Sequence, residues 1–379
     1  MRTVLVHDWL TGMRGGEKVL EALADLFPGA PILTLVHRPG AVSPALETHP
    51  IRVSWLGRLP GARRHYRKLL PLYPAAMATL RVPPADLVVS SSHAAAKAVR
   101  KPAGAVHVCY CYTPMRYLWD LYDDYFGPER ADWLTRAAMR ALRGPLRRWD
   151  VATAAGVDHW LAVSEHVRER IRRLYGCEST VLHPWVDLER FTPGGEAAGE
   201  RYLVVSALVP YKRIDLAIAA AARLGRGLDV VGTGPDAERL ARAAAAAGGD
   251  VRFLGWLDDA ALAPAYRGAR AVLMPGEEDF GIAPLEAMAS GRPVVACARG
   301  GALETVVDSE TGVLFAPQTA EALAAAIERC EAIAWDPARL RARAERFSRA
   351  RFVAAARELI AGFLARPAVG TWSTAASRS

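Results

Sequence analysis

The stretch that decides the fold of this chain runs from residue 274 to residue 305 and reads MPGEEDFGIAPLEAMASGRPVVACARGGALET. The apolar run Val272–Met274 indicates a buried strand, which the following Pro-Gly pair breaks. A helical pattern begins near Ile282 and stops at the Gly-Arg-Pro of 291–293, and Pro293–Cys297 indicates a second strand. The sequence therefore predicts a strand–loop–helix–strand unit, with Glu278 in the loop and Glu286 in the helix.

The loop and helix start of this unit can hold an anionic, polyhydroxylated ligand. A helix N-terminus offers free N–H groups and a partial positive charge to phosphate oxygens, and Gly281 lets the backbone approach a ligand closely. Carboxylates accept hydrogen bonds from hydroxyl groups, so Glu278 and Glu286 suit a sugar. Taken alone, the two glutamates are explained more simply by a favourable helix start and a solvated side chain than by a ligand.

The whole stretch resembles the E-x7-E signature of glycosyltransferase family 4, a group of retaining, nucleotide-sugar-dependent enzymes with the GT-B fold. Glu278 and Glu286 match its two glutamates, and FGIAPLEAMASGRPVV matches the surrounding pattern. The resemblance implies an α/β protein with two Rossmann-like domains facing across a cleft. It further implies that Glu286 holds the ribose, that Glu278 orients the hexose, and that the amides of Phe280, Gly281 and Ile282 stabilise the departing diphosphate.

Length and composition agree with a two-domain globular protein. The chain has 379 residues, of which 51% are hydrophobic and 23% charged. Its start, MRTVLVHDWL, has too short an apolar run for a signal peptide, and no run reaches the length of a membrane-spanning helix. The five cysteines show no zinc-type spacing and cannot all pair, which favours a reduced, cytoplasmic protein.

The net charge of +8 lies in the first half of the chain. Residues 1–190 contain 26 Lys+Arg and 18 Asp+Glu, whereas residues 191–379 contain 22 of each. We therefore expect something anionic to meet the first domain. No acidic residue occurs between Glu47 and Asp86, where aromatic and aliphatic residues alternate with seven basic ones: Arg52, Arg58, Arg63, Arg64, Arg67, Lys68 and Arg81.

Two interpretations of this basic segment remain open. It could be a core helix with a solvated basic face, or a monotopic patch that lies on anionic lipid at the inner face of the cytoplasmic membrane. Arg136, Arg140, Arg143 and Arg147 repeat the basic pattern at helical spacing. Mixtures of aromatic and basic residues also bind nucleic acid, but no recognised nucleic-acid module is present, and we expect no nucleic-acid partner.

The first half alternates between strand and helix patterns. Strand-like runs at Val4–His7, Pro31–Val36, Leu87–Ser91, Ala105–Cys111 and His159–Val163 predict a mostly parallel, doubly wound sheet. Ligands of such sheets gather at the carboxyl ends of the strands. Polar residues fall at these ends: Asp8, Ser90–His93, Tyr112–Met115 and Ser164–Glu165.

The first strand leads into a loop with paired glycines and a helix expected to run to Phe27. Arg14, Gly15 and Gly16 could bring backbone amides near a phosphate or an acceptor sugar, although Gly-Gly also forms ordinary turns. The loop resembles the glycine-rich loop that GT-B enzymes fold over the donor diphosphate. We therefore include Gly15 and Gly16 among donor-binding residues and Arg14 among acceptor-binding residues.

A segment dense in aromatic residues, 109–125, follows a predicted strand. Aromatic faces beside carboxylates suit a saccharide, so Arg116, Trp119 and Asp120 are candidate acceptor contacts, although packing between domains would explain them equally well. The segment resembles the bacterial O-antigen and polysaccharide mannosyltransferase subgroup. That subgroup commonly has His-Thr-Pro where this chain has Tyr112, and a tyrosine in this catalytic position is a poor proton shuttle at neutral pH.

In the second half, Lys212 stands ahead of a helix and could neutralise a leaving diphosphate, which makes it a catalytic candidate beside Glu278. Family members usually carry Arg where this chain has Ala207, so one charged phosphate contact is missing. Arg213 could compensate; otherwise the enzyme is impaired or Ala207 is an engineered change. By analogy with the family, Gly232, Gly234 and Trp256 cradle the nucleotide.

The predicted domains are residues 1–186, an N-terminal acceptor domain, and 187–347, a donor domain whose part after Glu304 is expected to be helical. A last helix at about 348–365 should cross back onto the first domain, and 366–379 form a tail. The resemblance implies transfer of a hexose without a metal or other cofactor, from GDP-mannose by best guess, to a lipid-linked or polysaccharide acceptor. A GT-B sugar-nucleotide epimerase and an impaired nucleotide-sugar-binding partner protein are the alternatives.

Overall fold

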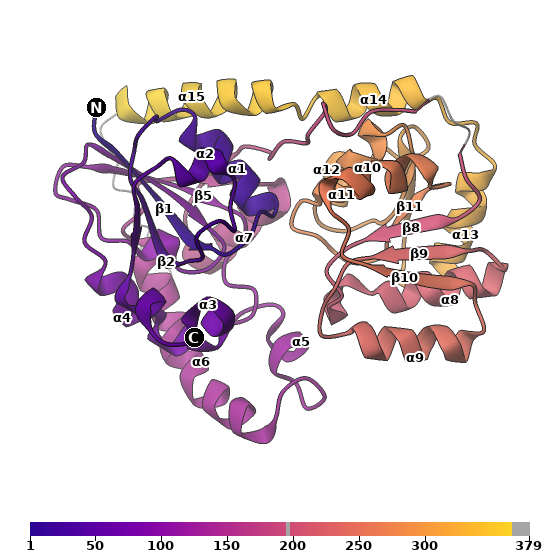
Figure 1. Ribbon diagram of the computed structural model, residues 1–379, viewed down its shortest axis with the longest axis horizontal. Helices are drawn as coiled ribbons and strands as arrows, with labels where there is room; N and C mark the ends of the chain where they lie inside the picture. Colours follow the sequence, from indigo (N-terminus) through magenta and orange to yellow (C-terminus); the bar gives the residue numbers. More distant parts are fainter. Residues whose placement is uncertain (195–197, 366–379) are drawn as a thin grey trace. The chain divides into compact units, whose positions relative to one another are not determined.

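The structure is a computed structural model that describes residues 1–194 and 198–365. The chain divides into two compact units, each built on one parallel sheet (Figure 1). Of the described residues, unit 1 comprises 1–183 and 352–365, and unit 2 comprises the part between 184 and 351. The expected tail at 366–379 lies outside the described residues.

Within the described residues, unit 1 has a seven-stranded sheet in the order β3-β2-β1-β4-β5-β6-β7, parallel throughout. Its strands are β1 (Thr3–Leu10), β2 (Ile32–His37), β3 (Ile51–Val53), β4 (Leu87–Ser92), β5 (Val106–Cys111), β6 (His159–Ala162) and β7 (Thr180–Val181). The chain leaves β1 toward β2 on one side and returns to β4 on the other. A topological switch point, where doubly wound sheets bind their ligands, therefore lies between β1 and β4.

The helices of unit 1 are α1 (Gly15–Ala24), α2 (Pro44–Glu47), η1 (Trp55–Arg58), α3 (Ala62–His65), η2 (Tyr66–Leu72), α4 (Tyr73–Thr79), η3 (Ala96–Ala98), α5 (Tyr122–Phe126), α6 (Trp133–Ala154) and α7 (Glu165–Tyr175). Helix α15 (Arg349–Ala365), drawn in yellow in Figure 1, also packs here. Its Phe352 ring meets Tyr110 at 5.8 Å between centroids, and Phe363 stacks on His159 at 4.2 Å.

Two element ends in unit 1 differ by three residues from the sequence expectation, whereas the other predicted strand bounds differ by at most one. Strand β1 extends to Leu10, so Asp8 lies within the strand rather than in the loop, because all eight residues of this central strand are buried between helices. Helix α1 ends at Ala24 rather than Phe27, and a turn closed by the Phe27 N–H on the Ala24 carbonyl at 2.9 Å follows it.

The sheet of unit 2 has six strands in the described chain, in the order β10-β9-β8-β11-β12-β13, again all parallel. They are β8 (Tyr202–Val205), β9 (Leu228–Val231), β10 (Val251–Gly255), β11 (Val272–Met274), β12 (Val294–Cys297) and β13 (Gly312–Phe315). The switch point lies between β8 and β11. Strand β13 forms where only helices were expected, because Gly312 lets it approach β12 closely: a Cβ there would lie 2.2 Å from the Val294 carbonyl oxygen.

The helices of unit 2 are η4 (Pro210–Lys212), α8 (Ile214–Leu224), α9 (Ala237–Ala247), α10 (Asp259–Gly268), α11 (Ile282–Ala289), α12 (Ala302–Thr305), α13 (Ala320–Glu331) and α14 (Pro337–Glu345). The predicted strand–loop–helix–strand unit is present as β11, α11 and β12. In the described chain, no helix combines the length and apolar character needed to cross a bilayer.

Candidate functional site

The loop after β11 is packed tightly against its neighbours through glycines. A Cβ at Gly276 would lie 2.7 Å from the Cα of Lys212, and one at Gly301 would lie 2.3 Å from the Cα of Phe280. The Gly301 N–H donates to the Glu278 carbonyl oxygen at 2.9 Å. These contacts bring the ends of β8, β11 and β12 together at the switch point, and they require glycine for steric reasons.

Lys212 and Glu278 form an ion pair at this place. The Lys212 ammonium donates to Oε1 of Glu278, and the two side chains are only 13% and 17% exposed. Glu278 also lies beside the start of α11, because a Cβ at Gly281, the N-cap residue, would lie 3.6 Å from the Glu278 Cβ. One cation, one carboxylate and the N-terminus of an eight-residue helix therefore meet at the switch point of unit 2.

Glu286 lies one turn further along α11 and is partly buried. Its Oε2 accepts a hydrogen bond of 2.7 Å from the hydroxyl of Tyr266 on α10. Burial raises the pKa of Tyr266 well above its usual value, so this hydroxyl keeps its proton and remains a donor. Tyr266 itself packs edge-on against Phe191 at 5.4 Å, and the carboxylate is thereby held by a rigid, buried partner.

The loop after β8 carries Ala207, at the position where the family resemblance predicts an arginine. The Ala207 side chain is exposed, so the departure from the family pattern removes a charge from a surface that a ligand can reach. Arg213 adopts a left-handed conformation with φ 51° and its guanidinium bonds the Asp215 carboxylate at 3.2 Å. For Arg213 to compensate, a phosphate would have to replace Asp215.

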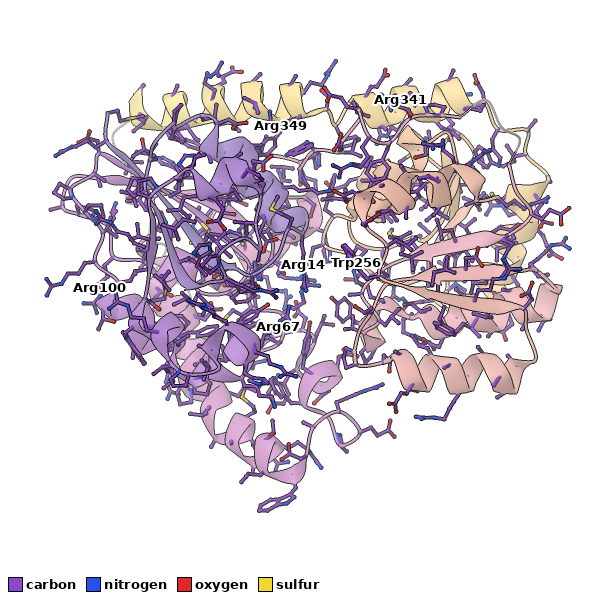
Figure 2. The ribbon with its side chains drawn as sticks, in the orientation of Figure 1. Arg14, Arg67, Arg100, Trp256, Arg341 and Arg349 are labelled. Carbon is purple, nitrogen blue, oxygen red and sulfur yellow. The ribbon has the colours of Figure 1, made fainter. Side chains whose placement is uncertain are left out.

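The predicted nucleotide loops of unit 2 meet one another at the same edge of the sheet. A Cβ at Gly232 would lie 1.8 Å from the carbonyl oxygen of Ser206, and one at Gly234 would lie 2.2 Å from that of Leu208. Both glycines are therefore needed for the β9 loop to pack on the β8 loop, whether or not a ligand binds. Trp256, labelled in Figure 2, follows β10 and is 73% exposed.

In unit 1, a chain of buried and partly buried hydrogen bonds connects the glycine loop to β4 and β1. Tyr112 donates its hydroxyl proton to the Gly16 carbonyl oxygen at 2.7 Å, so Ser91 donates to the Tyr112 oxygen at 2.8 Å. His7 Nδ1 in turn donates to Ser91 Oγ at 3.1 Å. Beyond His7, Glu17 has Oε1 3.8 Å from Nε2 and accepts from the Arg14 N–H at 3.0 Å through Oε2.

This network assigns Tyr112 a positioning task on the glycine loop. Burial raises the pKa of Tyr112 well above its usual value, and its proton is already donated to a backbone carbonyl. Such a hydroxyl is a weak proton shuttle near neutral pH. The catalytic role predicted for Tyr112 stays a prediction, and the geometry favours an effect on the conformation of Gly15 and Gly16.

Asp8 and His93, which the sequence places only at two separate strand ends, come together at this switch point. The Asp8 carboxylate is fully buried and accepts from four consecutive backbone N–H groups, those of residues 93–96, at 2.5 to 3.0 Å. It also lies 3.2 Å from Nδ1 of His93, whose ring meets Trp9 edge-on at 4.4 Å. The His93 side chain is 29% exposed, so the ring is fixed on one side and reachable on the other.

The remaining acceptor candidates are held by other parts of unit 1. Asp120 accepts from Arg173 at 2.9 Å through both oxygens and pairs with Arg170 at 2.9 Å. Trp119 donates from its indole to Asp150 at 2.8 Å and stacks under Arg147 at 4.4 Å. These contacts explain both residues structurally, while Arg116 is partly buried and the Arg14 side chain, labelled in Figure 2, is exposed.

Among residues 1–194 and 198–365, no group of three or more His, Cys, Asp or Glu is arranged to hold a metal ion. The metal-independent chemistry stays a prediction.

Comparisons with known proteins cover both units. The family description "Glycosyltransferase Family 4" matches residues 13–190, and "Glycosyl transferases group 1" matches residues 189–347. The chain is 36% identical over 210 residues to the D-inositol 3-phosphate glycosyltransferase of Kribbella flavida, covering 48% of this chain and 49% of that protein. It is 31% identical over 249 residues to the GDP-mannose-dependent alpha-(1-6)-phosphatidylinositol monomannoside mannosyltransferase of Mycolicibacterium smegmatis, covering 52% and 65%. The chain thus spans between about half and two thirds of the length of these relatives.

Solved structures resemble the chain over nearly its whole length. Sucrose-phosphate synthase from Thermosynechococcus elongatus has a TM-score of 0.72 at 22% identity, with 96% of this chain and all of that chain covered. HepE from Anabaena in complex with UDP has a TM-score of 0.70 at 20% identity and the same coverage. These likenesses show that the fold is GT-B. With the two family models adjoining over residues 13–347, the chain belongs to glycosyltransferase family 4.

Proposed function

We propose that the protein is a retaining glycosyltransferase that moves a hexose from a nucleotide sugar to an acceptor hydroxyl. The observation that carries this proposal is the Lys212–Glu278 pair at the start of α11, at the switch point between β8 and β11. A cation and helix amides suit a diphosphate, and a carboxylate beside them suits sugar hydroxyls.

In the proposed reaction, the bond between the anomeric carbon of the hexose and the diphosphate oxygen breaks, and its electron pair leaves with the diphosphate. Lys212 exchanges Glu278 for that diphosphate and, with the amides of residues 280–282, stabilises the developing charge. Glu278, released from the ammonium, accepts hydrogen bonds from the hexose hydroxyls. Glu286, oriented by Tyr266, accepts from the ribose hydroxyls.

Unit 1 is proposed to bind the acceptor. In this proposal the Nδ1–H of neutral His93 points to Asp8, which leaves Nε2 free of a proton. The hydroxyl group of the acceptor substrate then donates a hydrogen bond to Nε2. The hydroxyl oxygen forms the new bond to the anomeric carbon, and its proton passes to the departing diphosphate oxygen. His93 is thereby a contact residue for the acceptor that orients the attacking hydroxyl.

GDP-mannose is the donor we propose. The named activity of the Mycolicibacterium smegmatis relative supports it, together with the resemblance of residues 109–120 to polysaccharide mannosyltransferases. The acceptor we propose is a glycan on a lipid carrier, and the phosphatidylinositol mannoside substrate in that relative's name supports a lipid-borne acceptor. We further propose a cytoplasmic protein bound peripherally to the inner face of the membrane.

The test is transfer of radiolabel from a panel of nucleotide sugars, GDP-mannose among them, into lipid extracted from bacterial membranes. We expect GDP-mannose to label the lipid fraction, Glu278→Gln to reduce labelling at least about a hundredfold, and Glu238→Gln on the exposed face of α9 to leave it unchanged. Label that stays on the nucleotide in every reaction, or equal labelling by both variants, would contradict the proposal.

The same reactions separate the two alternatives. If the recovered nucleotide carries an isomerised sugar when no acceptor is present, the protein is an epimerase. If nucleotide sugar binds and stabilises the protein but neither transfer nor isomerisation follows, the protein is an impaired binding partner. The exposed Ala207, with no cation in its place, is the observation that favours the second alternative.

A further inference from the structure

A pocket of about 890 Å³ lies in unit 1, away from the residues assigned above to the donor and to the acceptor hydroxyl. Four arginines line it, Arg52, Arg58, Arg63 and Arg81, and they come from β3, η1, α3 and the turn after α4. We call this the arginine pocket. All four side chains are exposed, so a ligand can reach them.

The charge in the arginine pocket is uncompensated. No acidic residue lines it, and in the described chain no carboxylate forms an ion pair with any of its four arginines. The acidic residues on either side of this segment, Glu47 and Asp86, already have partners. Glu47 is bound by His37 at 3.1 Å and by the Gly40 N–H at 2.9 Å, and Asp86 pairs with Arg2 at 3.0 Å. Four guanidinium groups around one concave surface repel one another and focus a positive potential that an anion relieves.

The basic segment is held in place by its apolar side. Tyr66 and Tyr73 are buried and pack on Trp9 at 4.8 and 6.3 Å, and the Tyr73 hydroxyl donates to the Tyr66 carbonyl at 2.9 Å. Arg67, labelled in Figure 2, lies over the Tyr66 ring at 5.0 Å. Most of the aromatic residues interleaved with the arginines therefore belong to the core, and the short helices present the arginines outward.

Three apolar side chains of this segment remain at the surface. Trp55 is 39% exposed and lines the pocket, and Leu59 and Leu72 are 37% and 38% exposed. The Trp55 indole N–H donates to Thr79 at 3.0 Å, so the ring is held beside the guanidinium groups. Guanidinium groups with a fixed indole and exposed leucines in one segment match the interface between lipid headgroups and acyl chains.

The pocket also lies at the functional edge of the sheet. His37 and Val53, which line it, are the last residues of β2 and β3, and all strands of this parallel sheet end at the same edge. Two strand spacings, about 10 Å, separate β3 from β1 and its Asp8. A ligand in the pocket would thus lie within a few sugar lengths of His93.

We propose that the arginine pocket binds the headgroup of a lipid that carries two or more phosphate charges, such as a lipid diphosphate. Guanidinium forks bind phosphate oxygens in pairs, and four of them exceed what a neutral glycan or a single phosphate needs. The proposal deepens the lipid-linked acceptor proposed above and rests on it for its meaning. Its test is binding without donor, so a failed transfer assay leaves the binding result independent.

The experiment uses the full chain and measures co-sedimentation with three kinds of vesicle at low and at physiological salt. The vesicles contain phosphatidylcholine alone, phosphatidylcholine with phosphatidylglycerol, or phosphatidylcholine with undecaprenyl diphosphate at the same total negative charge. We compare wild type with the double variant Arg58→Gln/Arg63→Gln. The matched control is Arg100→Gln/Arg148→Gln, which removes the same charge from exposed arginines of unit 1 outside the pocket.

We expect wild type to bind the diphosphate vesicles about tenfold more tightly than the phosphatidylglycerol vesicles, and the pocket variant to lose that difference while the control keeps it. Thermal unfolding should show both variants as stable as wild type, because the substituted side chains form no hydrogen bond or ion pair within residues 1–194 and 198–365. Equal loss in both variants or equal binding to the two anionic vesicles would overturn the proposal. So would displacement from the diphosphate vesicles by a single-stranded oligonucleotide at the same phosphate concentration at which inorganic diphosphate displaces the protein.

Discussion

Oδ2 of Asp8 lies 3.2 Å from Nδ1 of His93, and the same carboxylate accepts from four consecutive backbone N–H groups. The residues are 85 positions apart: Asp8 lies within β1 and His93 directly follows β4, the two strands that flank the switch point of unit 1. These bonds hold Asp8 in place, and Nδ1 is the ring nitrogen of His93 that faces it. In the role proposed above, the Nδ1 proton points to Asp8 and Nε2 accepts from the acceptor hydroxyl.

Replacing His93 with Ala should raise the KM for the acceptor at least about tenfold while the KM for the donor changes less than about twofold. His93→Gln, which keeps an acceptor atom, should recover part of the loss. Burial lowers the pKa of His93 below its usual value, although the charge of Asp8 opposes this. The neutral form therefore persists at neutral pH, and kcat/KM for the acceptor should be flat from pH 8 to below 6.5 and fall only at lower pH. An equal rise of both KM values would contradict this role.

Replacing Asp8 with Asn should destabilise unit 1 by about 2 kcal/mol or more, because the amide group turns one buried acceptor into a donor that faces backbone N–H groups. Hydrogen exchange of the β1 and β4 amides measures this loss within unit 1. The control is Asp86→Asn, whose exposed carboxylate pairs with Arg2 and should matter little. Unchanged protection of β1 in the Asp8 variant would show that the four short contacts contribute nothing.

Tyr112→Phe removes the hydroxyl that donates to Gly16. We expect a loss of about 1 kcal/mol of stability and a reduction of kcat of less than tenfold, with an unchanged pH profile. A true proton shuttle at this position would contribute about a hundredfold or more. Steady-state kinetics of Tyr112→Phe beside Tyr110→Phe, whose buried hydroxyl donates to Leu182 instead, distinguishes the two roles.

Ala207→Arg should strengthen donor binding. The exposed side chain stands in the loop after β8, five residues before Lys212, and a second cation there could contact the diphosphate. One charge-assisted contact corresponds to about 1.5 kcal/mol, so the Kd for GDP-mannose should fall about tenfold, as measured by titration calorimetry. Ala207→Gln, which adds length without charge, should leave the Kd within about twofold of wild type. An unchanged Kd for the arginine variant would show that Arg213 already supplies the charge.

Unit 1 should lose stability as the pH falls from about 6.5 toward 4. Burial lowers the pKa of His107 to about 4, while its ring nitrogens contact the Gly156 carbonyl at 3.1 Å and Ser90 at 2.8 Å. Below pH 6.5 the unfolded chain binds a proton that the folded chain does not, so the folded state loses about 1.4 kcal/mol per pH unit, or about 3 kcal/mol in total. Hydrogen exchange of the β5 amides against pH measures this loss, and His107→Gln should flatten the curve. A curve with the same slope in the variant would assign the loss to other groups.

The parts of the fold that follow from local sequence were predictable. Strand β11, helix α11 and strand β12 lie within a residue of the expected bounds, because an apolar run, a Pro-Gly break and a Gly-Arg-Pro stop fix them locally. Strands β3 and β7 have three and two residues and pair with β2 and β6. Such short strands have no hydrophobic pattern from which the sequence could predict them.

The site was predictable to a smaller extent. The sequence predicts that Lys212 and Glu278 serve the same ligand. Their direct pairing, however, requires that β8 and β11 be neighbours in the sheet, although β9 and β10 separate them in the sequence. The Asp8–His93 contact depends likewise on the order of β1 and β4. When two side chains meet because their strands are neighbours in the sheet, the number of residues between them in the sequence does not predict the contact. The roles of these side chains toward a ligand remain predictions.

Because Lys212 already pairs with Glu278, an anion that binds to Lys212 must exchange with this carboxylate as the counter-ion. To bind here, an anion must displace the Glu278 carboxylate from the Lys212 ammonium. Chloride or a monoanionic metabolite gains little from this exchange. A dianion that carries a sugar can pair with Lys212 and offer hydroxyl groups to Glu278 at the same time. If the proposed donor binds here, discrimination between anions would begin at this ion pair, before any sugar hydroxyl is contacted.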